Sequence, residues 1–204
     1  MRVENSFIPV RGVGEQTERA LWERGVYTWE DFDGTVPGPA PADRVASFID
    51  TARERLDDGD AHFFGEQFPS GSQWRLYENF REETCFLDIE TTGLSQHRDD
   101  VTVVSCHRGG ETKTFVRGRD LHADRLAREL DDASLLVTFN GKRFDVPFLE
   151  TAYDLPVDVP HLDLMYPCRR LDLTGGLKEI EQRIGLERDR PDISGRDAVR
   201  LWHE

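Results

Sequence analysis

Two carboxylates, Asp88 and Glu90, lie two positions apart where the apolar run 85–87 ends. On a β-strand, residues i and i+2 point to the same face, so both side chains should project together from the edge of a core. Like charges this close are costly unless a cation lies between them. Hard oxygen ligands of this type suit Mg²⁺ or Mn²⁺. For this pair alone, a solvated acidic strand end is the competing interpretation.

A third carboxylate, Asp145, follows a second apolar run. That run, residues 135–139, ends in the turn signal Asn140-Gly141, and Asp145 then stands between two phenylalanines. The pattern predicts a strand that feeds a helix, in which Asp145 alone could be an N-terminal cap. Together, the three carboxylates could converge on one or two divalent ions ~3.5–4 Å apart, the geometry that activates water in phosphodiester hydrolysis.

Four segments carry a resemblance to a known family. FLDIETTGL and VTFNGKRFDVPFL resemble the first two motifs of the DEDD 3′–5′ exonucleases, specifically the YprB-like branch. HLDLMYPCRRL and GGLKEIEQRIGLERDRPDISGRDAVRLW are similar to later parts of that branch, so the resemblance spans residues 84–204. It implies the ribonuclease-H-like α/β fold, a mixed sheet flanked by helices. It also implies a 3′–5′ exonuclease that hydrolyses single-stranded DNA or RNA by a two-metal mechanism.

The resemblance also implies roles for individual residues. Asp88, Glu90 and Asp145 match the catalytic carboxylates that hold two Mg²⁺ or Mn²⁺ ions. The stretch that meets the 3′-terminal nucleotide matches Thr91, Thr92, Gly93 and Leu94. In the second motif, the residues expected to contact nucleic acid are Asn140, Lys142 and Arg143. His161 is the only histidine close to the motifs, and we expect it to make a structural hydrogen bond rather than to act as a base.

One part of the family pattern is missing. Members of this branch complete the metal site with an aspartate from a Tyr-Asn-x-x-Asp segment, and this chain reaches Glu204 without one. We therefore expect a C-terminally truncated nuclease domain, with Asp197 or Asp192 as the alternative fourth ligand. Asp192 also fits a turn and helix start. A catalytically weak or inactive nucleic-acid-binding module that positions a partner is the alternative function.

The N-terminal third shows a different pattern. Gly12-Val13-Gly14 precedes a helical segment and resembles a helix-hairpin-helix, whose Gly-x-Gly turn offers backbone N–H groups to phosphate. A helical hairpin that only packs on the nuclease domain is the alternative. A Pro- and Gly-rich linker over 34–42 and a helix over 43–56 complete a helical region, residues 1–60.

An aromatic-rich connector, residues 61–83, leads to the exonuclease domain, residues 84–204. Its rings could stack on bases, but we expect them to pack on the sheet; they are Phe63, Phe64, Phe68, Trp74, Tyr77 and Phe80. In the exonuclease domain, periodicity predicts strands over 84–90, 101–107, 111–117, 135–139 and 161–165. It predicts helices over 122–132, 144–152, 175–184 and 194–203.

Net charge at first argues against a nucleic-acid partner. It is −14, whereas a basic surface is expected for phosphate binding. However, the chain has 22 aspartates and 23 arginines but only three lysines, a composition that resembles proteins of extreme halophiles. Counterion release contributes little to binding in concentrated salt. A halophilic nuclease would rely on metal-bridged phosphate, base stacking and local cations such as Lys142 and Arg143.

Cysteine content and hydropathy indicate an intracellular location. The three cysteines are far apart and are predicted to be buried free thiols. No apolar stretch approaches ~18 residues, and the N-terminus lacks a signal-peptide core. We therefore expect a cytoplasmic protein without a membrane partner, and the sequence favours no particular oligomeric state.

Overall fold

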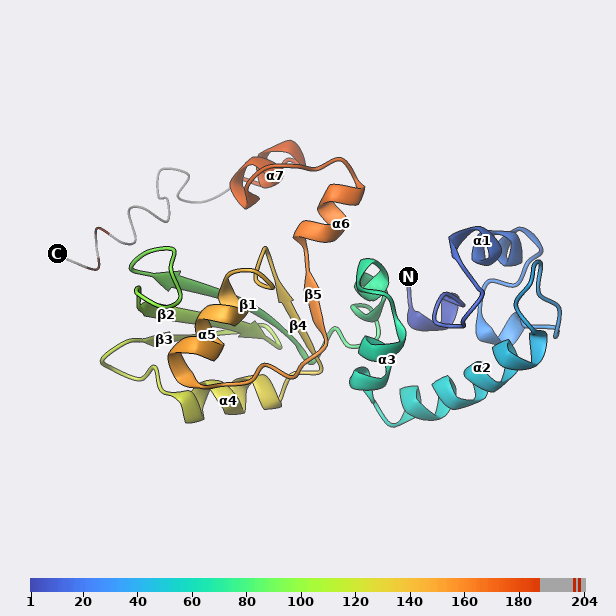
Figure 1. The fold of residues 1–204 in the computed structure, drawn as a ribbon, viewed down its shortest axis with the longest axis horizontal. Coiled ribbons are helices and arrows are strands. Elements are labelled where there is room, and N and C mark those ends of the chain that lie inside the picture. The colour runs from blue at the N-terminus through green and yellow to red at the C-terminus, as the bar shows by residue number, and fades with distance from the viewer. Residues whose placement is uncertain (188–199, 201, 203–204) are drawn as a thin grey trace. The chain divides into compact units, whose positions relative to one another are not determined.

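The computed structural model of the chain describes residues 1–187, 200 and 202 (Figure 1). Asp192 and Asp197, the two alternative metal ligands, lie outside the described residues. The chain divides into two compact units, Met1–Arg81 and Glu82–Glu204. None of the described helices is long and apolar enough to cross a membrane.

The N-terminal unit is helical. Its elements, with η denoting a 3₁₀ helix, are η1 (Val3–Asn5), α1 (Glu15–Glu23), η2 (Trp29–Asp31), α2 (Ala42–Asp57), α3 (Ala61–Gln67) and η3 (Ser70–Leu76). Helix α2 forms where the sequence predicts it, because Val45, Ile49 and Ala52 recur at helical spacing and are buried.

Aromatic rings fill the core of this unit. Trp29 stacks on Phe64 with 6.4 Å between ring centroids and meets Phe48 edge-on at 5.9 Å. Phe64 also contacts Phe63 at 5.1 Å and Phe80 at 6.0 Å. These connector rings therefore belong to the core of the N-terminal unit, whereas the sequence predicted a connector packed on the sheet. Offset and edge-on ring pairs of this kind add stability beyond their buried area.

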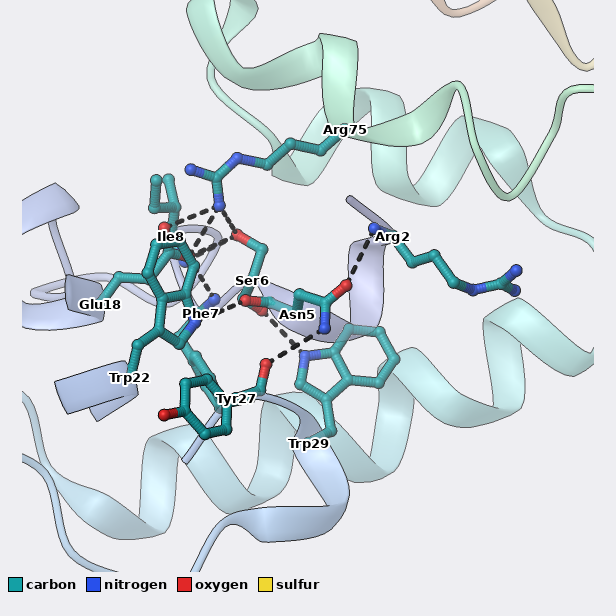
Figure 2. Close-up of polar contacts among 10 residues, drawn as sticks. All are labelled: Arg2, Asn5, Ser6, Phe7, Ile8, Glu18, Trp22, Tyr27, Trp29 and Arg75. Carbon is teal, nitrogen blue, oxygen red and sulfur yellow. Dashed lines mark hydrogen bonds and ion pairs between the residues drawn. The ribbon is translucent and has the colours of Figure 1, made fainter. Parts of the chain in front are cut away.

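A buried ion pair ties α1 to η3 (Figure 2). Glu18 is 1% exposed and Arg75 is 6% exposed, and Arg75 Nη1 lies 2.7 Å from Glu18 Oε2. Glu18 Oε1 also accepts hydrogen bonds from the Ser6 hydroxyl at 2.7 Å and from the Phe7 N–H at 2.8 Å. The stability of this unit depends on keeping both charges, because removing one would leave the other buried without a partner.

The second unit contains a five-stranded mixed sheet with strand order β3-β2-β1-β4-β5. The strands are β1 (Thr84–Thr91), β2 (Val101–Arg108), β3 (Glu111–Val116), β4 (Leu135–Thr138) and β5 (His161–Asp163). β1 pairs antiparallel with β2, and β2 with β3, whereas β1, β4 and β5 run parallel. The predicted mixed sheet is therefore confirmed.

Helices α4 (Ala123–Asp131) and α5 (Asp145–Tyr153) cover one face of the sheet (Figure 1). Alternate residues of β1 point into this core, and Leu126 of α4 and Phe148 of α5 meet them. Two further helices, α6 (Met165–Arg170) and α7 (Leu177–Arg183), follow β5. The strand predicted over 161–165 ends at Asp163, and α6 begins two residues later.

Candidate metal and nucleic-acid site

The candidate site lies at the carboxyl edge of the sheet, between β1 and β4. From β1 the chain turns to β2 on one side, whereas β4 continues through α5 to β5 on the other side. The connections after β1 and β4 therefore diverge. Crevices at such reversals of strand order are where α/β sheets bind ligands.

Asp88 and Glu90 lie on the same, less buried face of β1. Burial alternates along this strand, so Leu87 and Ile89 enter the core while Asp88 is exposed and Glu90 half-buried. The pairing of β1 with β2 shifts register between Glu90 and Thr91. Irregularities of this kind re-aim side chains next to functional sites. Burial raises the pKa of Glu90, and the negative charge of Asp88 raises it further.

Asp145 approaches β1 from the start of α5. It is 5% exposed, and its Oδ1 accepts a hydrogen bond from the Ile89 N–H at 3.2 Å. β4 pairs with β1 only as far as Phe86, so beyond that residue the side of β1 that faced β4 is open to Asp145. Asp145 is the first residue of the helix, while the cap position belongs to Phe144. The cap interpretation of Asp145 is therefore wrong.

The charge of Asp145 responds to its surroundings. Burial, with a smaller contribution from the nearby charge of Asp88, raises the pKa of Asp145 to about 7. Asp88 thus opposes ionisation of both Glu90 and Asp145, as expected for carboxylates that lie near one another. The donors are all hard oxygens, which fit Mg²⁺ or Mn²⁺. In the described part of the chain, however, no three His, Cys, Asp or Glu side chains are grouped closely enough to hold a metal ion.

The residues after Glu90 form a tight loop. The Thr91 hydroxyl donates to the Gly93 carbonyl at 2.5 Å, and the Thr92 N–H donates to the Asp100 carbonyl at 2.9 Å. A Cβ at Gly93 would overlap the Asp99 carboxylate, so any larger residue here would have to displace that side chain. Leu94 follows with 87% of its surface exposed. The loop therefore presents an apolar side chain to solvent.

The second motif forms the turn between β4 and α5. Asn140 adopts a left-handed backbone with φ 66°, Lys142 is half-buried and Arg143 is exposed. Burial lowers the pKa of Lys142, while the charge of Asp163 raises it. Arg143 offers its charge to solvent at the start of α5.

Two residues from β5 support this turn. Asp163 accepts hydrogen bonds from the Asn140 N–H at 2.7 Å and the Lys142 N–H at 3.1 Å, an interaction that sequence analysis missed. Its signal was available, since Asp163 directly follows an apolar strand residue, as Asp88 follows the apolar run 85–87. His161 Nε2 lies 2.8 Å from Thr138 Oγ1, which is the structural hydrogen bond expected of it. Burial, with a smaller contribution from the charge of Lys142, lowers the pKa of His161 to about 4.

Gly12 and Gly14 belong to the N-terminal unit. Gly12 has φ +99°, a conformation that favours glycine, and Gly14 is the N-cap of α1 with no side-chain cap bond. The only helix before Gly12 is the single turn η1, so one of the two helices of the expected hairpin is a short 3₁₀ turn.

Comparison with known proteins places the second unit in a family. The profile of the RNase H superfamily matches residues 85–204. A search of curated proteins finds no match.

Solved structures with similar folds include three of known description. One is the apo form of a nuclease, with 22% identity, a TM-score of 0.44, and coverage of 56% of this chain and 59% of that one. The family B DNA polymerase of the hyperthermophilic archaeon Pyrobaculum calidifontis has 19% identity and a TM-score of 0.49, and the match covers 59% of this chain and 21% of the polymerase. Brucella melitensis NrnC with bound Mg²⁺ has 23% identity and a TM-score of 0.42, and the match covers 61% of this chain and 66% of NrnC. The match therefore spans only part of each of these proteins, and at such TM-scores it assigns no activity.

Proposed function

This chain belongs to the RNase H superfamily, and on that premise we propose that it is a divalent-metal-dependent 3′–5′ exonuclease for single-stranded DNA or RNA. The observation that carries the proposal is the coupling of Asp88 to both Glu90 and Asp145 at the carboxyl edge of the sheet. Carboxylates that oppose one another's ionisation are stabilised in their charged form by a cation between them.

The three carboxylates would hold the metal, and two ions would bind when a further carboxylate completes the site. Divalent ions held there would supply an activated water and charge stabilisation for the leaving 3′-oxygen. The chain's own residues bind and orient the strand. Exposed Leu94 offers an apolar surface to the terminal nucleotide, and Lys142 and Arg143 offer positive charge to its phosphates.

An assay on end-labelled single strands tests the proposal. DNA and RNA oligonucleotides labelled at either the 3′ or the 5′ end are incubated with the protein in Mg²⁺, Mn²⁺ or a chelator. A 3′–5′ exonuclease releases the 3′ label first as a mononucleotide and shortens the 5′-labelled strand step by step. Chelation should abolish both signals, because the carboxylates alone do not activate water.

Matched variants connect the activity to the site. Asp145→Asn removes one charge at the site and should lower the rate by at least ~10²-fold, on the scale of lost charge stabilisation in other enzymes. Asp131→Asn removes one charge from the exposed end of α4 and should leave the rate unchanged. Equal rates in both variants would show that a contaminant or another site cuts the strand.

A non-cleaving nucleic-acid-binding module is the second candidate. The observation in its favour is that no three donors are grouped for a metal ion among residues 1–187, 200 and 202. Such a module would bind labelled single strands in chelator and in Mn²⁺ with the same affinity, and would never shorten them. The exonuclease should instead bind more tightly in Ca²⁺ or Mn²⁺, because a divalent ion held by the carboxylates would also attract the phosphates of the strand.

We also propose that the turn Gly12–Gly14 contacts phosphate. The supporting observations are that Gly14 caps α1 without a side-chain bond and that Gly12 has φ +99°, so the start of this helix presents only backbone on the side of the turn. This contact would add affinity for long strands without taking part in hydrolysis.

A further inference from the structure

Asp163 is a buried carboxylate that accepts hydrogen bonds from the loop after β4 and from the first residue of α6. The residue ends β5 and is 2% exposed. Its Oδ1 accepts hydrogen bonds from the N–H groups of Asn140 at 2.7 Å and Met165 at 3.0 Å. Its Oδ2 accepts from the Lys142 N–H at 3.1 Å. Both oxygens of this carboxylate are therefore engaged by the backbone.

The loop that Asp163 holds has an unusual shape. Asn140 has a positive φ of 66°, which costs free energy in a residue other than glycine. Its neighbour Gly141 donates its N–H to Thr138 Oγ1 at 3.1 Å. Three successive N–H groups, those of residues 140, 141 and 142, thus point at side-chain oxygens from β4 and β5. Backbone amides close together in a loop can form a concave anion-binding nest, and here the Asp163 carboxylate accepts from two of the three, those of residues 140 and 142.

The same loop sets the start of α5. The Phe144 N–H donates to the Asn140 carbonyl at 3.2 Å, and the Val146 N–H donates to the Gly141 carbonyl at 2.9 Å. Asp145 lies between these two bonds, so its position against β1 follows the position of the loop. Lys142 extends from the same loop.

We propose that Asp163 is a positioning residue for the site: it holds the loop 140–142 so that Asp145 stays against β1 beside Asp88. The inference rests on the proposed role of Asp145 as a metal ligand. Because both of its carboxylate oxygens bond to backbone N–H groups, Asp163 would act through the loop and not on the substrate or metal directly. Charge-assisted bonds from a carboxylate to backbone N–H groups are stronger than neutral ones, which suits a loop that must stay in a costly conformation.

Asp163→Asn tests the proposal with little change in volume. The side-chain amide keeps one acceptor oxygen but turns an NH₂ group toward a backbone N–H, so at least one bond to the loop is lost. Leu162→Ala is the matched control. Leu162 is a buried neighbour on the same strand, and its truncation weakens packing without removing an acceptor from the loop.

Three measurements distinguish the two variants: amide hydrogen exchange at residues 140, 142 and 165, Mn²⁺ affinity by calorimetry, and kcat and KM on a 3′-labelled strand. In Asp163→Asn we expect faster exchange at these amides, an affinity for Mn²⁺ reduced by at least ~10-fold, and a lower kcat at similar KM. Leu162→Ala should lower the Tm but leave the Mn²⁺ affinity and kcat near wild type.

Each other outcome has a definite meaning. Equal losses of Mn²⁺ affinity in the two variants would overturn the positioning role, because ordinary destabilisation would then explain both. If the wild type cleaves no strand, the proposed exonuclease function fails, while the difference in Mn²⁺ affinity still decides the role of Asp163.

If Asp163→Asn does not fold, Thr138→Val replaces it. That variant removes both the acceptor for the Gly141 N–H and the bond between Thr138 and His161. It should reduce Mn²⁺ affinity in the same direction, and unchanged affinity would overturn the proposal.

Discussion

At the scale of single residues, Asp88 is the group on which the metal hypothesis depends. A ligand that binds only the folded state stabilises it by about 2.7 kcal/mol at one hundred times its Kd. For a chain of this size, that corresponds to a rise in Tm of about 5–10 °C. We expect Mn²⁺ to produce such a rise in the wild type and not in Asp88→Ala, as measured by thermal melts with and without the ion. A similar rise in both proteins would contradict the assignment of Asp88, and Asp131→Ala controls for loose binding of Mn²⁺ to an acidic surface.

His161 gives the chain a pH dependence with a definite sign. Burial lowers its pKa to about 4 from the ordinary value of 6.5. Between these values the unfolded chain takes up a proton and the folded chain does not, so stability present above pH 6.5 is lost as the pH falls toward 4. We expect a loss of about 2 kcal/mol in the wild type relative to His161→Gln over this window.

Urea unfolding of both proteins at pH 7.5 and pH 4.5 measures this difference. Asp145 acts in the opposite direction, because its raised pKa lowers stability as the pH rises toward 7. It is present in both proteins, so its contribution cancels in the comparison. Parallel pH profiles would mean that His161 is protonated equally in the folded and unfolded states.

The sequence predicts site residues that share one strand better than it predicts contacts between residues of different elements. The shared face of Asp88 and Glu90 follows from the two-residue period of a strand, and the structure has it. The hydrogen bond from Ile89 to Asp145 depends on where β4 leaves β1, which no local pattern specifies. The bonds of Asp163 likewise depend on the parallel pairing of β4 with β5.

At the scale of elements, the strands and most helices are predicted to within a few residues, and α6 is the clear exception. The sequence analysis predicts no helix over residues 165–170, but α6 forms there with Pro167 in its first turn. Proline is tolerated there because the first N–H groups of a helix have no partner within the helix. The aromatic connector was assigned to the wrong core for a related reason, because ring content predicts burial without saying which surface covers the rings.

The ion pair between α1 and η3 predicts an asymmetric mutational response. Arg75→Met should cost about 3–5 kcal/mol, because it leaves Glu18 buried without a partner. The double variant Glu18→Leu with Arg75→Met should cost less than the single one, since no charge is then stranded. Urea unfolding measures both. Arg55→Met, which breaks an exposed pair with Asp60 in the same unit, should cost less than about 1 kcal/mol.

The Gly12–Gly14 turn makes a prediction about binding. Replacing Gly12 and Gly14 together with alanine should weaken binding of long single strands several-fold while leaving hydrolysis of a dinucleotide unchanged. Gly25→Ala is the control for backbone strain, because Gly25 has φ +89° and lies just beyond the end of α1. Fluorescence anisotropy measures the affinity. Equal binding by the double variant and the wild type would leave this turn with a packing role only.

At the scale of the whole molecule, net charge and its distribution predict how stability responds to salt. The chain has 40 acidic and 26 basic residues, so negative charges are in excess and repel one another. Folding brings these charges closer together, so the repulsion destabilises the folded state. Salt screens this repulsion, and it also weakens exposed ion pairs such as Arg2–Glu4 and Arg117–Asp100. Exposed pairs contribute at most about 1 kcal/mol each, whereas the excess of negative charge acts on every group of the surface. The two effects oppose each other, and we expect relief of repulsion to dominate.

We therefore predict that the Tm rises with KCl, and that most of the rise is complete near 1 M, where the Debye length is about 3 Å. Calorimetric scans between about 0.1 M and 3 M KCl measure the rise across that screening range. A variant with Glu66→Lys and Asp131→Lys, two exposed charge reversals, should melt higher than the wild type at low salt and gain less from KCl. A Tm that falls with KCl would show that exposed ion pairs outweigh repulsion, and the acidic composition would then not stabilise the fold in concentrated salt. A Tm that continues to rise well beyond 1 M in both proteins would point instead to stronger burial of apolar surface, because screening by then is nearly complete.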